Sequence, residues 1–162
     1  MTFAVRDLSD NPSVRAGLLR INNETARETS LLAPDKLDSM IAAARVATTI
    51  EPGIAFLLAF AQSDDFDGGH FRWFRERLDT FLYIDRVVVG QGYRRLGLGR
   101  LLYEDLFRRA ELLGHSNIVC EVNVRPPNPT SAAFHAAFGF IEIGTATIDD
   151  GIKTVRYLLR RR

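Results

Sequence analysis

The chain has 162 residues and a formal net charge of +1, and 46% of its residues are hydrophobic and 25% charged. This length favours a single domain, and the composition is typical of a globular protein rather than a disordered, fibrous or membrane chain. The near-neutral charge argues against nucleic-acid binding, although the chain ends in three arginines.

The first part of the chain alternates between strand and helix signals. Pro12 and Pro34 each suit the first position of a helix, and apolar residues follow both at helical spacing. A β-branched segment and an apolar segment then flank Pro52, which predicts a hairpin. The predicted elements are a strand at 3–8, a helix from Pro12 with a buried stripe through Ile21, a helix at 34–45, and strands at 46–50 and 54–61.

The second part begins with a polar loop at 62–69, and the aromatic segment 70–77 that follows is assigned no element. Leu98, Leu102 and Leu106 follow the helical period, and Gly114 is placed to end that helix. The remaining predicted elements are a strand at 81–89, a helix at 97–113, a strand at 117–124, a rigid turn at 126–129, a helix at 130–138, strands at 140–148 and 152–159, and a turn at 149–151.

This order of elements predicts a mixed, layered α/β domain. No repeat or linker divides the chain, so we expect one domain over residues 1–162. Cys120 is the single cysteine, the amino terminus lacks the pattern of a signal peptide, and the longest apolar run is shorter than the ~20 residues of a membrane span. A cytoplasmic location without membrane contact is therefore expected.

The segment between the strand at 81–89 and the next helix predicts an anion site. The first amides of a helix lack internal acceptors, and Gly97 and Gly99 let a phosphate approach them. Arg94, Arg95 and Arg100 lie where the helix dipole disfavours cations, and a bound polyphosphate would reverse that cost. The alternative is a tight strand-to-helix turn with solvated arginines.

Other phosphate-binding loops fit this segment less well. A loop of the NTPase kind requires Gly-Lys followed by Ser or Thr, whereas Gly99 precedes Arg100 and Leu101. The dinucleotide fingerprint requires a third glycine, which does not follow Gly90 and Gly92.

Two linked motifs resemble the GNAT superfamily of acetyl-CoA-dependent N-acetyltransferases. The first is a strand ending in valines at 87–89, a short loop, and then Arg94-Arg95-Leu96-Gly97-Leu98-Gly99; the second is the segment 128–140. The resemblance implies about seven strands in a mixed, mostly antiparallel sheet with about four helices on its two faces.

The resemblance also implies an activity, which is direct transfer of acetyl from acetyl-CoA to an amine in a ternary complex, without a metal. The acceptor is left open among a small molecule, a peptide terminus and a lysine, and a homodimer is compatible with the family. A non-catalytic acyl-CoA sensor is the alternative.

By the same resemblance, the valine strand and the arginine loop would hold the cofactor, with the second motif beside its pantetheine arm. The implied cofactor-binding residues are Val87, Val88, Val89, Arg94, Arg95, Leu96, Gly97, Leu98, Gly99, Arg100, Asn128, Ser131 and His135.

The catalytic candidates are His135, Asp85 and Glu121. The family's usual thiol-protonating tyrosine is replaced by His135, which either donates a proton or only packs. Asp85 and Glu121 compete as the base that deprotonates the amine, and a salt bridge with Arg86 is the alternative for Asp85.

The acceptor candidates are Tyr83, Asp85 and Trp73. Period two places Tyr83 and Asp85 on one strand face with Val87 and Val89. Trp73 belongs to the aromatic segment, where packing is the competing explanation. Cys120 is expected to be a buried small residue rather than a nucleophile.

Overall fold

The structure is a computed structural model that describes residues 2–25, 30–125, 127–148 and 150–162. Its centre is a seven-stranded sheet in the order β1-β2-β3-β4-β5-β7-β6, in which every neighbouring pair is antiparallel except β4 and β5. The strands are β1 (Val5–Asp7), β2 (Val46–Ile50), β3 (Ala55–Ala61), β4 (Leu82–Val89), β5 (Asn117–Arg125), β6 (Ile141–Ile148) and β7 (Lys153–Arg161).

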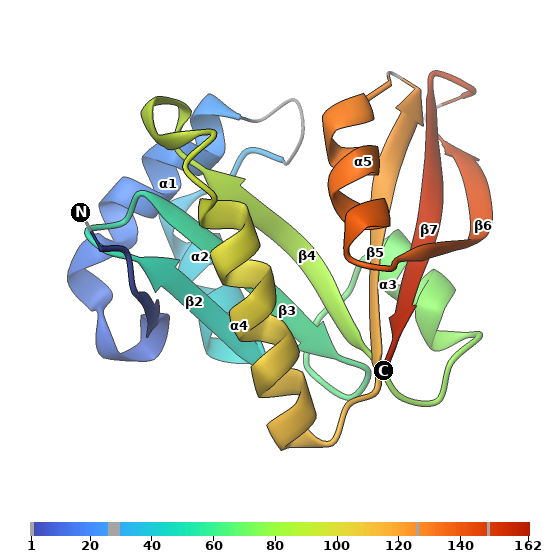
Figure 1. The fold of residues 1–162 in the computed structure, drawn as a ribbon, viewed down its shortest axis with the longest axis horizontal. Coiled ribbons are helices and arrows are strands. Elements are labelled where there is room, and N and C mark those ends of the chain that lie inside the picture. Colours follow the sequence, from blue (N-terminus) through green and yellow to red (C-terminus); the bar gives the residue numbers. More distant parts are fainter. Residues whose placement is uncertain (1, 26–29, 126, 149) are drawn as a thin grey trace.

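Five α-helices among the described residues cover the two faces of the sheet (Figure 1). They are α1 (Arg15–Glu24), α2 (Pro34–Ala43), α3 (Gly69–Arg75), α4 (Leu98–Leu113) and α5 (Pro129–Ala137). Leu18, Leu37 and Phe71 bring α1, α2 and α3 into one buried cluster, whereas Leu102 brings α4 into a second cluster against which Phe134 of α5 packs. The domain therefore has the three-layer arrangement expected of a mixed α/β sheet.

The sheet forks between β4 and β5. Their parallel pairing is limited to Leu82 with Ile118 and Tyr83 with Val119. Beyond these pairs the two strands diverge toward their carboxyl ends, as Figure 1 shows. The parallel step and the fork together separate β1–β4 from β5–β7 at the end of the sheet where α4 begins.

Helix α3 is the element that the sequence did not predict. Phe71 and Phe74 lie three residues apart on one face of the helix and are fully buried. Trp73 points elsewhere and stacks on Tyr157 of β7, with 4.0 Å between the ring centroids. The burial of these aromatic residues explains a helix of only seven residues, and it raises the number of helices from about four to five.

The other predicted elements are confirmed, with small shifts at their ends. The first strand is shorter than expected because Leu8 already begins a 3₁₀ turn, and residues 12–14 form another such turn before α1. Pro126 and Asp149, in the two predicted turns, lie outside the described residues. Within the described part of the chain, no helix combines the length and the apolar character that crossing a bilayer requires.

Candidate active site

A cleft of about 820 Å³ occupies the fork between β4 and β5. Its walls come from β4, β5, the β4–α4 loop and the first turns of α4 and α5, together with Thr25 after α1 and Lys153 at the start of β7. Every cofactor-binding residue predicted from the sequence lines this cleft except Leu96, which is 53% exposed. The fold therefore brings the two sequence motifs together around one cavity.

The start of α4 presents free backbone amides to the cleft. Gly97 precedes the helix with φ of 78°, in the left-handed region that favours glycine, and no side chain caps the helix. The first internal hydrogen bond runs from the Leu101 amide to the Gly97 carbonyl at 3.1 Å. The amides of Leu98, Gly99 and Arg100 therefore have no acceptor within the helix, which is the geometry of an anion cradle.

Three arginines surround this cradle. Arg94 and Arg95 are exposed and form no ion pair within the described part of the chain, whereas the Arg100 Nε lies 2.9 Å from Glu104. All three line the cleft. Their positive charges and the uncapped helix end add together, so the residues present fit a polyphosphate.

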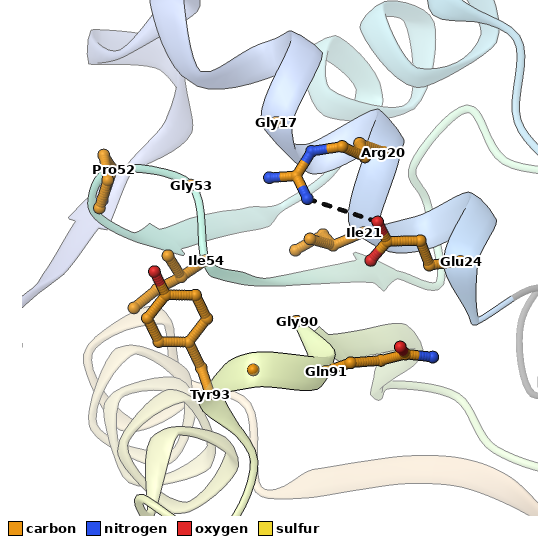
Figure 2. Close-up of a pocket in the computed structure, with 11 residues that line it drawn as sticks. Gly17, Arg20, Ile21, Glu24, Pro52, Gly53, Ile54, Gly90, Gln91 and Tyr93 are labelled. Atoms are coloured by element: carbon orange, nitrogen blue, oxygen red, sulfur yellow. Dashed lines mark hydrogen bonds and ion pairs between the residues drawn. The ribbon is translucent and has the colours of Figure 1, made fainter.

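A smaller pocket of about 380 Å³ lies behind the same loop (Figure 2). It is bounded by α1, the β2–β3 turn and the start of the β4–α4 loop, and Tyr93 borders both this pocket and the main cleft. The Gly90 amide donates to the Ile54 carbonyl at 2.8 Å, and a Cβ at Gly90 would lie 3.2 Å from that oxygen. Glycine at this position thus lets the loop rest directly on the β2–β3 turn.

His135 is buried between α5 and α4 and uses both ring nitrogens. Its Nδ1 lies 2.7 Å from the Ser131 carbonyl oxygen, and its Nε2 lies 2.7 Å from the Tyr103 hydroxyl. A carbonyl only accepts, so Nδ1 carries the proton, and Nε2 of the neutral ring accepts from Tyr103. Burial lowers the pKa of His135, against the opposing effect of the Ser131 carbonyl. In this arrangement His135 has no free N–H to offer to a leaving group.

Asn128 and Ser131 define the start of α5. The Asn128 side-chain oxygen accepts a hydrogen bond from the Ser131 amide at 3.2 Å, as an N-cap residue does. Asn128 also lines the cleft, and its side-chain nitrogen makes no hydrogen bond within the described part of the chain. Tyr103 also lines the cleft, and sequence reasoning missed it because its contact with His135 joins residues that lie far apart in the sequence.

A β-bulge at Asp85 changes the expected face of β4. Leu58 pairs with Arg86 and Ala59 pairs with Ile84, so Asp85 is an extra residue in the strand. Tyr83 and Val88 therefore join the cluster under α1, α2 and α3, whereas Val87 and Val89 pack on the α4 side. The expectation that Tyr83 shares a face with Val87 and Val89 is wrong, because strict period two does not pass through a bulge.

Asp85 forms the salt bridge that was its competing explanation. The Arg86 Nε lies 2.7 Å from an Asp85 carboxylate oxygen, and both side chains are largely buried although Asp85 lines the cleft. Arg86 also donates to the Asn22 side-chain oxygen at 2.9 Å and contacts Ser30. Arg86 thus connects the bulge of β4 to the end of α1.

Glu121 faces the cleft from β5, two residues beyond Val119, which is the last residue of that strand to pair with β4. The Tyr83 hydroxyl donates to its two carboxyl oxygens at 3.0 and 2.9 Å. Burial raises the pKa of Glu121 to about 8; the Tyr83 hydrogen bond acts against this shift and the Asp85 charge adds to it. Tyr83 itself lies beneath the cleft and reaches it only through Glu121.

Trp73 and Cys120 both pack with the hydrophobic core of the protein, which was the alternative to a functional role for each. Trp73 does not line the cleft but is held between Tyr157 and the Arg77 guanidinium, which lies 3.9 Å from the Trp73 ring centroid. Cys120 is buried, and burial together with the nearby Glu121 raises the pKa of its thiol. Among the residues that the structure describes, no group of His, Cys, Asp and Glu is arranged to hold a metal ion.

Comparisons with known proteins agree with this architecture. Residues 53–140 match the model of a family described as "Acetyltransferase (GNAT) family". A comparison with curated protein sequences finds no significant match.

Several solved structures share the fold over the whole chain. A chain of the NatC complex bound to a Gag peptide and CoA aligns at TM-score 0.76 and 14% identity, covering 100% of this chain and 99% of that one. Ard1 from Thermoplasma volcanium aligns at 0.78 and 14%, covering 99% and 98%. The ribosomal-protein-S18-alanine N-acetyltransferase from Escherichia coli aligns at 0.67 and 18%, covering 99% and 92%. At these identities the likeness establishes the fold.

Proposed function

The chain belongs to the GNAT family of acetyltransferases, and we propose that it transfers the acetyl group of acetyl-CoA directly to an amine of a small molecule, a peptide terminus or a lysine. One observation carries this proposal: the same cleft has an uncapped helix end with arginines at one side and a partly buried carboxyl, that of Glu121, at the other. We call residues 94–100 the cofactor half of the cleft, and Asp85, Glu121 and Lys153 the acceptor half.

In the cofactor half, the amides of Leu98, Gly99 and Arg100 would bind the pyrophosphate, with Arg94 and Arg95 balancing its charge. When bound, acetyl-CoA supplies an acetyl group activated as a thioester. Residues 87–89 pair with β3 on one side, but on the side of the fork β4 has no neighbouring strand there. The peptide groups on that side are available to orient the pantetheine arm and the thioester carbonyl.

In the acceptor half, Glu121 is the candidate base that the geometry favours over Asp85. An alkylammonium has a pKa of ~10.4, so its attack requires removal of a proton. Asp85 already neutralises Arg86, whereas Glu121 faces the cleft with a pKa of about 8. Above that pH Glu121 is a carboxylate, and its basicity is matched to the task better than that of an ordinary carboxylate.

The departing thiolate requires less assistance. A thiol has an unperturbed pKa of ~8.5, so solvent at the mouth of the cleft suffices to protonate it near neutral pH. Because the neutral ring of His135 is tied to Ser131 and Tyr103, we assign His135 to holding α5 against α4 rather than to acid catalysis.

The test combines calorimetry with acetyl-CoA and a thiol-release assay on an amine panel. The variant Arg94→Ala/Arg95→Ala should weaken acetyl-CoA binding, and Arg6→Ala/Lys36→Ala, which removes two exposed charges elsewhere, should not. Absence of acetyl-CoA binding would refute the proposal. Binding without transfer to any amine would leave the non-catalytic sensor as the better description. Sedimentation of the same samples tests the homodimer, which stays a prediction.

A further inference from the structure

The acceptor half continues outward from Glu121 along two paired strands. Glu121 of β5 lies opposite Tyr157 of β7, and Asn123 lies opposite Val155. Tyr157 and Val155 belong to the core cluster under α1, α2 and α3, so the residue two positions earlier on β7, Lys153, lies on the same face. This face therefore carries an acid, an amide and a lysine in succession.

Lys153 is a half-buried residue of the cleft wall. Within the described part of the chain it forms no ion pair. Its charge also acts on the acceptor half, because it contributes to lowering the pKa of His70, after burial, and opposes the raised pKa of Glu121. Lys153 is one of two lysines in the chain, and the other, Lys36, is exposed on α2.

The charges in the acceptor half do not cancel. Asp85 is paired with Arg86, and the Glu121 carboxyl accepts from the Tyr83 hydroxyl at 2.9 Å, so neither acid is the ion-pair partner of Lys153. Lys153 is then the uncompensated charge on this side of the cleft. A substrate that carries only positive charge would be repelled, whereas a substrate with an anionic group beyond its amine would gain an ion pair.

We propose that the acceptor is a peptide-like amine with an acidic side chain near its amino terminus, and that Lys153 binds this carboxylate. Lys153 lies four residues from Tyr157, which is the strand partner of Glu121. At ~3.4 Å per residue, the backbone of Lys153 is therefore about 14 Å along the strands from that of Glu121. An extended peptide with its amine at Glu121 brings the side chain of its second or third residue within reach of the lysine. This inference rests on the proposed amine acetylation and defines its substrate.

The experiment uses peptides that are identical except for Glu, Gln or Lys at the second or third position. With acetyl-CoA saturating, we expect kcat/KM to favour the Glu peptide over the Gln peptide about three- to fivefold at low salt, with the preference fading as salt screens the pair. Lys153→Met should abolish the preference, and Lys153→Glu should reverse it toward the Lys peptide. Lys36→Met is the matched control and should keep the wild-type ratio.

Two outcomes would overturn the proposal: equal kcat/KM for the Glu and Gln peptides in the wild type, or an equal loss for both peptides in Lys153→Met. Circular dichroism verifies that each variant is folded. Peptide affinity is measured in parallel by calorimetry in the presence of CoA. If no peptide is acetylated, transfer to a peptide terminus is excluded, whereas the amine panel still tests the proposed function. The ratio of the affinities for the Glu and Gln peptides then decides whether Lys153 binds an acidic side chain.

Discussion

The two halves of the cleft are built from different chemical groups. The cofactor half depends mainly on the backbone, through three uncapped amides of α4 and a glycine in the left-handed region. Exposed arginines add positive charge to it. The acceptor half uses side chains whose properties come from their neighbours, such as Glu121 hydrogen-bonded to Tyr83 and Asp85 beside Arg86. A backbone site tolerates changes in the surrounding packing, whereas a site of buried side chains depends on it. The predictions below test this contrast.

The largest effect is expected for Glu121→Gln, which keeps the size of the side chain but removes the base. Loss of a general base costs about 10²- to 10⁴-fold in kcat/KM, and acetyl-CoA affinity should stay unchanged. In the wild type kcat/KM should rise with pH toward about 8, because the raised pKa keeps Glu121 protonated below that pH. Deprotonation of the free amine would also make kcat/KM rise with pH, so the profile is measured with two acceptors of different amine pKa. The midpoint of a rise that Glu121 causes should stay near 8 for both acceptors. If Glu121→Gln showed the same rise of kcat/KM with pH, Glu121 would be excluded as its cause.

Gly144→Ala tests the packing next to the acceptor half, where Trp73 stacks on Tyr157, the strand partner of Glu121. A Cβ at Gly144 would lie 2.5 Å from Cζ2 of Trp73, and this ring is held between Tyr157 and Arg77. Overpacking of this kind costs about 1–3 kcal/mol, and each kcal/mol lowers Tm by roughly 2–4 °C in a chain of this size. Thermal unfolding measures the loss, with Gly92→Ala as the control because its Cβ meets no atom within 4 Å. An unchanged Tm would mean that Trp73 can move away from the added methyl group without a loss of stability.

Gly97→Val addresses the cofactor half. A non-glycine residue in the left-handed region costs about 1–2 kcal/mol, so the free loop should relax, and acetyl-CoA binding must restore its conformation. We expect the acetyl-CoA Kd to rise about tenfold, with the acceptor KM at saturating cofactor unchanged. Leu96→Ala, in the same loop but outside the cleft, provides the comparison in calorimetry. Equal affinities for both variants would show that the left-handed turn is not required.

Tyr103→Phe should have the smallest effect. It removes the donor to His135 Nε2 and leaves that nitrogen without its partner, which costs about 1 kcal/mol of unfolding free energy. Denaturant unfolding measures this loss. Because we assign the pair to holding α5, kcat should stay within about twofold of the wild type. A fall in kcat by more than an order of magnitude would return the pair to proton transfer.

Most of the fold was predictable because its signals are local. The leucine period of α4, the prolines before α1 and α2, and the β-branched strands all depend on neighbours in sequence. Helix α3 was missed because Phe71 and Phe74 are weak helix formers that become helical by burial in the tertiary core. A propensity argument contains no information about that burial.

The candidate site divides in the same way. The residues of 94–100 were predicted as an anion site from glycine positions and helix-end charge, and the cleft contains all of them except Leu96. The face of Tyr83 was mistaken because a bulge at Asp85 appears only when β3 and β4 are paired. The raised pKa of Glu121 and the pairing of His135 with Tyr103 depend on burial and on long-range contacts.

The fork adds unpaired strand edges in the middle of the sheet. An open sheet of seven strands ordinarily has two unpaired edges, which here are the outer edges of β1 and β6. Because β4 and β5 pair over two residues only, their facing sides above the fork add two more, with peptide groups that no neighbouring strand satisfies. Such edges invite pairing with foreign chains. A ligand with amide groups that lay in the fork would act as a substitute strand, and it would cover peptide groups that are otherwise open to a foreign chain.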